Sequence, residues 1–120
     1  MTTSDPGYEI SPERLPETIT TYLAAHRARD IDTAVGHYTD DATVVDEGNS
    51  YRGPGRIRDW LRHSAGEYTY TTTLTGAQKV DDEHYTATHR LEGDFPGGIV
   101  DLRFRFTLRD GRISALTIEP

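Results

Sequence analysis

The sequence predicts an α+β domain in which three helices from the first half of the chain cover one side of a curved, mainly antiparallel sheet. Two observations support this fold class. Apolar residues recur at helical spacing in three segments of the first half, whereas the second half alternates between apolar and polar residues. The turn-forming stretches DDE, FPGG and RDG also divide that second half into four segments of strand length. Helices followed by a run of antiparallel strands are typical of an α+β domain.

The first helix is predicted to follow a short polar leader. Residues 1–11 are mainly Thr, Ser, Asp, Pro and Gly, so we expect a flexible leader before a single domain over residues 12–120. Pro16 then suits a first helical turn, and apolar side chains share one helix face up to about Arg29. That face comprises Leu15, Ile19, Tyr22, Leu23 and His26.

Two further helices are predicted in the first half. Asp32 is a favourable N-cap for a short second helix with the apolar residues Ala34, Val35 and Tyr38. Pro54 suits the first turn of a third helix, and Gly66 suits its end. The inward-facing residues of this third helix are expected to be Ile57, Trp60 and Leu61.

The strands are predicted from β-branched residues and alternation. The run from Thr43 to Val45 indicates a strand over residues 42–46, between the second and third helices. In the second half, residues 100–109 give the clearest alternation. One face of this strand is apolar and the other polar, so we expect one covered face of the sheet. The apolar face comprises Val100, Leu102, Phe104, Phe106 and Leu108.

Composition excludes several classes of function. The 120 residues suit one domain, and the net charge of -7 disfavours nucleic acid as a partner. There is no cysteine, which excludes disulfides and thiolate chemistry. The N-terminus lacks the pattern of a secretory signal, and no apolar run reaches the ~18 residues of a membrane helix. We therefore expect a cytoplasmic protein without membrane contact.

The segment from Tyr22 to Leu61 carries several motifs: an aromatic residue on the first helix, the link D-x-D, the stretch Y-x-D-D-A-T-V-x-D, and the helix entry Y-R-G-x-x-x-I-R-x-[FW]. In these motifs the sequence resembles the nuclear-transport-factor-2-like superfamily, and within it the SnoaL-like polyketide cyclases and the bacterial ketosteroid isomerases. The resemblance implies a cone-shaped, cystatin-like fold whose sheet surrounds a pocket for a hydrophobic small molecule. It also implies homodimers that form through the outer face of the sheet.

The resemblance further implies a candidate active site. In the isomerases, the position of Asp46 holds a carboxylate that shuttles a proton, and the position of Tyr22 holds a hydrogen-bond donor to the developing enolate. The aromatic residue at the position of Trp60 forms pocket wall. Fold relatives that dehydrate or cyclise polyketides pair a histidine with an aspartate, and His89 is the candidate for that histidine.

Alternation alone leaves the orientation of Asp46 open. If Val44 faces the core, Asp46 points into the same apolar space, where desolvation raises the pKa of a carboxyl toward a value useful for a general base. If Val45 faces the core instead, Asp46 lies in solvent. Both candidates also have structural alternatives. Asp46 can accept hydrogen bonds from the backbone of the DEGN turn, and Tyr22 can be a core tyrosine with a fixed acceptor.

Two departures argue against a steroid isomerase. The isomerases place a second, protonated carboxylic acid on the strand that here reads IVDLRFRF, and aligning the two phenylalanines puts Leu102 at that position. The missing donor corresponds to ~2.7–4 kcal/mol of activation free energy, by comparison with deletions in other oxyanion holes. The isomerases also continue with an apolar turn after the base, whereas Glu47 and Gly48 follow Asp46 here.

The sequence thus predicts a small-molecule enzyme that carries out cofactor-free acid/base chemistry (isomerisation, cyclisation or dehydration) on a hydrophobic carbonyl compound. The alternative is a non-catalytic ligand-binding or dimerisation module of the same fold. No histidine spacing indicates a metal site, and no glycine-rich motif indicates a nucleotide cofactor. The predicted catalytic residues are Asp46, Tyr22 and His89, and the predicted pocket-lining residues are His26, Trp60, Tyr70, Leu102 and Phe104.

Overall fold

The computed structural model describes residues 7–67 and 69–120 and confirms the α+β fold class. After a 3-10 turn at Pro12–Arg14, the helices are α1 (Glu17–Ala28), α2 (Ile31–Gly36) and α3 (Pro54–Glu67). The strands are β1 (Tyr8–Ile10), β2 (Tyr38–Asp46), β3 (Asn49–Arg52), β4 (Tyr70–Asp81), β5 (His84–Gly93), β6 (Ile99–Arg109) and β7 (Arg112–Glu119). Within the described ranges, no helix has both the length and the apolar composition needed to cross a membrane.

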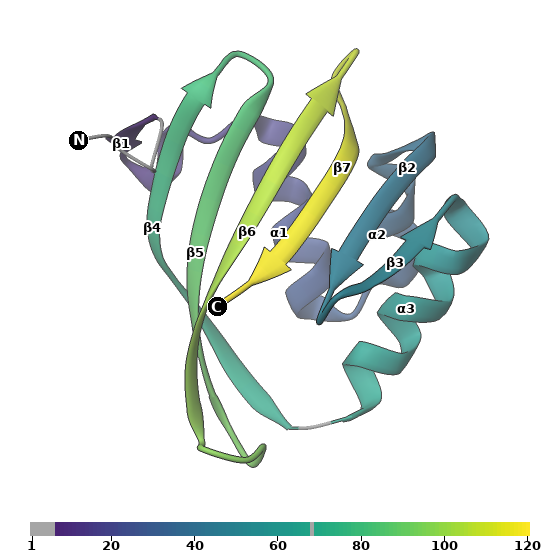
Figure 1. Cartoon of the computed structure of the whole chain (residues 1–120), viewed down its shortest axis with the longest axis vertical. Coiled ribbons are helices and arrows are strands. Elements are labelled where there is room, and N and C mark those ends of the chain that lie inside the picture. The colour runs from purple at the N-terminus through teal and green to yellow at the C-terminus, as the bar shows by residue number, and fades with distance from the viewer. Residues whose placement is uncertain (1–6, 68) are drawn as a thin grey trace.

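The described strands form one sheet in the order β1-β4-β5-β6-β7-β2-β3. Neighbouring strands are antiparallel except β2 and β7, which pair in parallel and place Asp46 opposite Ile118. Figure 1 shows α1 and α2 behind the sheet and α3 beside β3, while β4, β5 and β6 twist and extend past the helices at one end. At that end, β4, β5 and β6 therefore form a curved part of the sheet that the helices do not cover.

The predicted second half is confirmed as four antiparallel strands, β4 to β7. On β6, Phe104 and Phe106 are buried and Arg105 between them is exposed, as the alternation predicted. These aromatic residues pack against α1, Phe106 against Tyr22 and Phe104 against His26. The largest fully buried side chains are Tyr22, Phe106, Ile19, Ile57, Ile113, Leu116 and Val44.

The junction between α1 and α2 differs from the sequence prediction. α1 ends at Ala28, because its C-cap residue Arg29 adopts a left-handed conformation (φ 60°) that stops the helix. The chain then turns directly into α2. The N-cap of α2 is Asp30, whose carboxylate accepts a hydrogen bond from the N–H of Thr33. The prediction of Asp32 as the N-cap is therefore wrong. Asp32 lies in the first turn of α2 and forms an ion pair with Arg58 of α3.

β2 begins earlier than predicted and continues through a hairpin into β3, a strand that the sequence analysis did not predict. The turn residues Glu47 and Gly48 both have positive φ, 54° and 77°, which suits the twist of a two-residue hairpin. The DEGN turn therefore joins two paired strands, with Asp46 opposite Asn49.

The predicted flexible leader is only partly described by the structure, because residues 1–6 lie outside the described ranges. Tyr8–Ile10 form β1 and pair with Lys79, Gln78 and Ala77 of β4, which corrects the prediction for these three residues. Backbone pairing with an exposed strand edge requires little apolar surface, so composition did not indicate it.

Candidate functional site

Asp46 points toward the interior from the end of β2. Ala42 and Val44 on the same strand face are fully buried, which confirms the first of the two strand phases. The carboxylate is half-buried, and its Oδ2 accepts a hydrogen bond from the indole Nε1 of Trp60 at 3.0 Å. Hydrogen bonds to a charged acceptor are the stronger kind. The indole therefore holds the carboxylate in one orientation.

A cavity of about 500 Å³, here called the Asp46 cavity, opens beside this carboxylate. Its volume suits a small organic ligand. Most of the lining is apolar, including Leu91, Val100 and Ile118. All five predicted pocket-lining residues belong to its wall, namely His26, Trp60, Tyr70, Leu102 and Phe104.

Trp60 reaches this cavity because of how α3 begins. Gly53 adopts φ 86°, a left-handed conformation that favours glycine, and Pro54 then opens the helix. The Trp60 ring packs against Tyr51 of β3 and His26 of α1, with ring centroids 6.1 and 6.0 Å apart. The indole thus connects α1, α3 and the β2–β3 hairpin around Asp46.

Tyr22 lies behind the cavity wall. Its side chain is fully buried, and its hydroxyl oxygen accepts a hydrogen bond of 2.6 Å from the hydroxyl of Tyr38. Burial raises the pKa of Tyr22, the hydrogen bond from Tyr38 opposes this shift, and the nearby Asp46 carboxylate adds to it. Tyr22 does not line the Asp46 cavity or any of three other cavities found among the described residues. The structure therefore brings Tyr22 close to Asp46 without exposing its hydroxyl to the cavity.

The sequence analysis missed the role of Tyr38. It assigned this residue to the apolar stripe of the second helix, whereas Tyr38 is the first residue of β2 and is 3% exposed. Regular alternation could not have indicated this position, because Asp40 has the same even spacing but is exposed, and the pairing of β2 with β7 shifts register between Tyr38 and Thr43.

His26 lies one helical turn after Tyr22 and lines the Asp46 cavity. Its ring packs edge-on against Phe104, with centroids 6.2 Å apart. Burial lowers the pKa of His26 to about 4, so the imidazole is neutral at neutral pH. A neutral imidazole can donate one hydrogen bond and accept one.

His89 is buried on β5, in register with Leu102 of β6. Its ring packs against Phe104 at a centroid distance of 4.6 Å, and together with His26 and Tyr70 it lines a small void of about 20 Å³. Burial chiefly lowers the pKa of His89 to about 4, with the charges of His26 and Arg27 adding to the shift and the Ala87 backbone opposing it. Among the described residues no hydrogen-bond partner reaches its Nδ1. His89 thus lies next to the Asp46 cavity but not in its lining.

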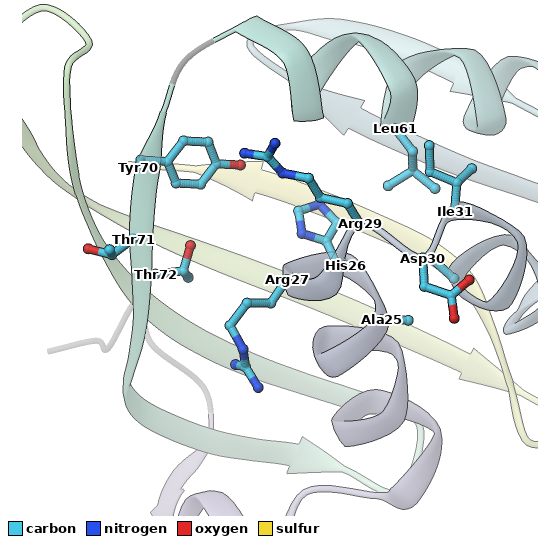
Figure 2. Close-up of a pocket in the computed structure, with 11 residues that line it drawn as sticks. Ala25, His26, Arg27, Arg29, Asp30, Ile31, Leu61, Tyr70, Thr71 and Thr72 are labelled. Carbon is cyan, nitrogen blue, oxygen red and sulfur yellow. The ribbon is translucent and has the colours of Figure 1, made fainter.

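Tyr70 is the tyrosine whose side chain lines the Asp46 cavity. Burial raises its pKa, the charge of Arg29 opposes this shift, and the charge of Asp46 adds to it. The phenol therefore lies between a positive and a negative side chain. Figure 2 shows its hydroxyl pointing toward Arg29, with His26 beside them.

The structure thus brings Asp46, His26, Trp60 and Tyr70 around one cavity, and it places Tyr22 and His89 in the surrounding core. Within the described ranges, no three histidine, aspartate or glutamate side chains gather in a way that could hold a metal ion. The arrangement offers one oriented carboxylate, one phenol and one neutral imidazole in an apolar enclosure. These groups can exchange a proton with a bound molecule and donate hydrogen bonds to it.

The chain matches the family described as the SnoaL-like domain over residues 19–116. No curated protein sequence matches it.

Solved structures share the fold. A putative polyketide cyclase from Sinorhizobium meliloti is 29% identical, with a TM-score of 0.85 over 92% of this chain and 100% of that one. A hypothetical protein with a ketosteroid isomerase-like fold from Catenulispora acidiphila, in complex with trimethylamine, is 20% identical, with a TM-score of 0.76 over 88% and 85%. TerC, co-crystallised with polyporic acid, is 18% identical, with a TM-score of 0.74 over 86% and 88%. Related structures also carry the descriptions cystatin fold and NTF2-like.

Proposed function

Because the chain belongs to the SnoaL-like domain family, we propose that it catalyses cofactor-free proton transfer on a hydrophobic carbonyl compound bound in the Asp46 cavity. The observation that carries this proposal is the Asp46 carboxylate, held by the Trp60 indole at the edge of a largely apolar cavity of about 500 Å³. The likeness to a putative polyketide cyclase and the binding of polyporic acid by TerC support a carbonyl-bearing organic ligand.

In the proposed reaction Asp46 is the general base. Its carboxylate removes a proton from the carbon next to the carbonyl group, and the carbonyl oxygen becomes an enolate oxygen. The hydroxyl of Tyr70 and the neutral imidazole of His26 line the same cavity and donate hydrogen bonds to that oxygen. In an isomerisation, the protonated Asp46 then returns the proton to another carbon of the ligand. In a cyclisation, the enolate carbon first bonds to a second carbonyl carbon of the ligand, and Asp46 protonates the alkoxide oxygen that results.

Tyr22 and His89 take indirect roles in this proposal. The hydroxyl of Tyr22 accepts a hydrogen bond from Tyr38 and keeps its own proton. Because Tyr22 is fully buried, it does not touch the ligand and acts only through its electrostatic effect on Asp46. His89 holds Phe104 from behind the cavity wall. The predicted homodimer also stays a prediction.

A binding module without catalysis is the second candidate function. Leu102 lines the cavity where the isomerases place an acid, so no carboxylic acid donor supplements Tyr70 and His26 there. Loss of one such donor slows catalysis by ~10²–10³-fold in other enzymes. The lining of the Asp46 cavity would suit a ligand that is bound without being converted equally well.

Hydrogen–deuterium exchange tests the proposal without knowledge of the natural substrate. The probe is β-tetralone, an apolar ketone with exchangeable protons next to its carbonyl group, followed by NMR in D₂O. We expect the wild-type protein to accelerate exchange and Asp46→Asn to lower the rate by ~10²–10⁴-fold, the usual contribution of a general base.

The matched control is Asp40→Asn, which removes an exposed carboxylate from the same strand. If Asp40→Asn and Asp46→Asn lower the exchange rate equally, Asp46 is not the base. If the wild-type protein binds the ketone without accelerating exchange, the binding module is the better description.

A further inference from the structure

A second cavity of about 360 Å³, here called the cationic cavity, lies at the carboxyl end of α1. Its polar lining comes from the end of α1, the start of α2 and the first residues of β4. These residues are His26, Arg27, Arg29, Asp30, Tyr70 and Thr72. Figure 2 shows Arg29 reaching across this space toward the Tyr70 hydroxyl, with Arg27 directed along β4.

The cationic cavity shares part of its wall with the Asp46 cavity. His26 and Tyr70 line both, one from α1 and the other from β4. The guanidinium of Arg29 lies close enough to the Tyr70 phenol to oppose the rise in its pKa. A ligand that contacts Tyr70 from the Asp46 cavity therefore has the positive charge of Arg29 next to it.

Arg29 is exposed to solvent, and no carboxylate of the described residues pairs with its charge. Most arginines on the sheet pair with carboxylates, as Arg103 and Arg105 do with Glu119. Among the described residues, neither Arg27 nor Arg29 forms an ion pair. Arg27 and Arg29 differ from other arginines without an ion pair in that both line the cationic cavity.

Two effects oppose an anion in this cavity. The carboxyl end of α1 carries partial negative charge, which disfavours an anion there and which arginines near the end of the helix offset. Asp30 also belongs to the lining, although its carboxylate already accepts from the N–H of Thr33. The two positive charges of Arg27 and Arg29 outnumber the one negative charge of Asp30, so the lining of the cavity has a net positive charge. The Asp46 cavity, by contrast, is negative, because Asp46 and Glu47 belong to its lining. Glu119 also lines it, but its charge is paired with Arg103 and Arg105.

From this separation of charge we infer that the ligand is an apolar carbonyl compound that also carries an ionised oxygen group. Its apolar body and carbonyl group lie in the Asp46 cavity, and its ionised oxygen group binds Arg29 in the cationic cavity beside Tyr70. The inference rests on the proposed function for the location of the ligand body, and it adds the charge and the orientation of the ligand. The acid group at Arg29 keeps the negative charge of the ligand away from Asp46, so that the base faces the neutral end of the molecule.

Two fluorescent dyes with the same aromatic body test this inference by equilibrium titration. Anilinonaphthalene sulfonate carries an oxyanion, and phenylnaphthylamine lacks it. We expect Arg29→Gln to weaken binding of the sulfonate by about five-fold, the factor that corresponds to the upper value for one partly exposed ion pair, and to leave phenylnaphthylamine within two-fold. Arg29→Lys keeps the charge and is expected to retain most of the sulfonate affinity.

The charge-matched control is Arg112→Gln. Arg112 lies at the β6–β7 hairpin, whose Gly111 carbonyl accepts a hydrogen bond from Thr18 at the opposite end of α1. A loss with Arg29→Gln that Arg112→Gln does not reproduce supports the inference. Equal losses for the two variants, equal losses for the two dyes, or no loss at all would overturn it.

The readout separates this inference from the proposed function, because dye binding requires no turnover. If Arg29→Gln binds both dyes as the wild type does while ketone exchange still depends on Asp46, only the inference about the acid group fails. If neither dye binds the wild-type protein, the predicted ligand and its orientation are both wrong.

Discussion

At the scale of single residues, the site depends on hydrogen bonds that fix aromatic and acidic side chains in the core. The indole of Trp60 donates to Asp46, and the hydroxyl of Tyr38 donates to Tyr22. Each bond satisfies a polar group that burial would otherwise leave without water. The Tyr38–Tyr22 pair also lets the core hold two phenols next to each other, with ring centroids 5.2 Å apart.

The tyrosine pair gives a prediction for stability. Tyr38→Phe removes the donor and leaves the buried Tyr22 oxygen without it, so we expect the free energy of unfolding to fall by about 1–3 kcal/mol. Urea denaturation followed by circular dichroism measures this change. Tyr8→Phe is the control, because Tyr8 is 58% exposed, and a similar loss in both variants would contradict a specific role of the pair.

At the scale of elements, β4 and β5 approach closely where the cavities begin. Gly93, at the end of β5, has no side chain, and a Cβ atom there would lie 2.3 Å from the carbonyl oxygen of Thr69 and 2.8 Å from the Cα of Tyr70. These neighbours are backbone atoms, which cannot rotate away. Gly93 therefore sets the position of the strand segment that presents Tyr70 to both cavities.

Gly93→Ala is expected to force β4 and β5 apart at this point and to destabilise the protein by about 1–3 kcal/mol, as overpacking does. Because Tyr70 moves with the strand, binding of phenylnaphthylamine is also expected to weaken. Gly76→Ala on β4 is the matched control, since a Cβ atom at Gly76 would meet no other atom within 4 Å. Thermal denaturation compares the two variants, and equal melting temperatures would refute this account of Gly93.

The elements that the sequence predicted are those with a repeated pattern. The helix faces and the strands β4 to β7 follow from periodicity that extends over several turns or pairs of residues. β1 and β3 are only three and four residues long, too short for such a pattern, and they depend on a neighbouring strand edge. The choice between Asp30 and Asp32 as N-cap depended on the conformation of Arg29, which no local preference for arginine indicates.

The same limit applies to the site. Alternation along the strand placed Leu102 and Phe104 on one apolar face, and in the structure both side chains belong to the lining of the Asp46 cavity. Whether a polar side chain reaches the cavity or stops behind its wall depends on what packs in front of it. Phe104 lies against His89 and Tyr38 bonds to Tyr22, and both contacts join segments that are distant in the sequence.

At the scale of the whole molecule, two buried histidines make stability depend on pH. His26 and His89 have pKa values of about 4 in the folded protein, against ~6.5 for an unperturbed histidine. Between these values the unfolded chain binds more protons than the folded one, so stability falls as the pH is lowered through ~6.5 and levels off near 4. Asp41 also has a lowered pKa, about 2, because of hydrogen bonds from Arg109 and Thr39, and its effect is confined to more acidic conditions.

We expect the free energy of unfolding to decrease by on the order of 2 kcal/mol per histidine between pH 7.5 and 4.5. Urea titrations across this range measure the slope. His89→Gln is expected to flatten it, whereas His63→Gln, at an exposed position of α3, is expected to leave it unchanged. An unaltered slope in His89→Gln would exclude His89 as a source of the pH dependence.

The parallel pairing of β2 with β7 has a consequence for synthesis on the ribosome. Asp46 is aligned with Ile118. The hydrogen bonds between β2 and β7 therefore form only after β7, the last strand of the sheet in the sequence, has been synthesised. The β4–β5–β6 meander can assemble while β2 and β3 still lack that neighbour. A nascent chain halted before β7 emerges would thus leave the acidic hairpin exposed to chaperones and proteases.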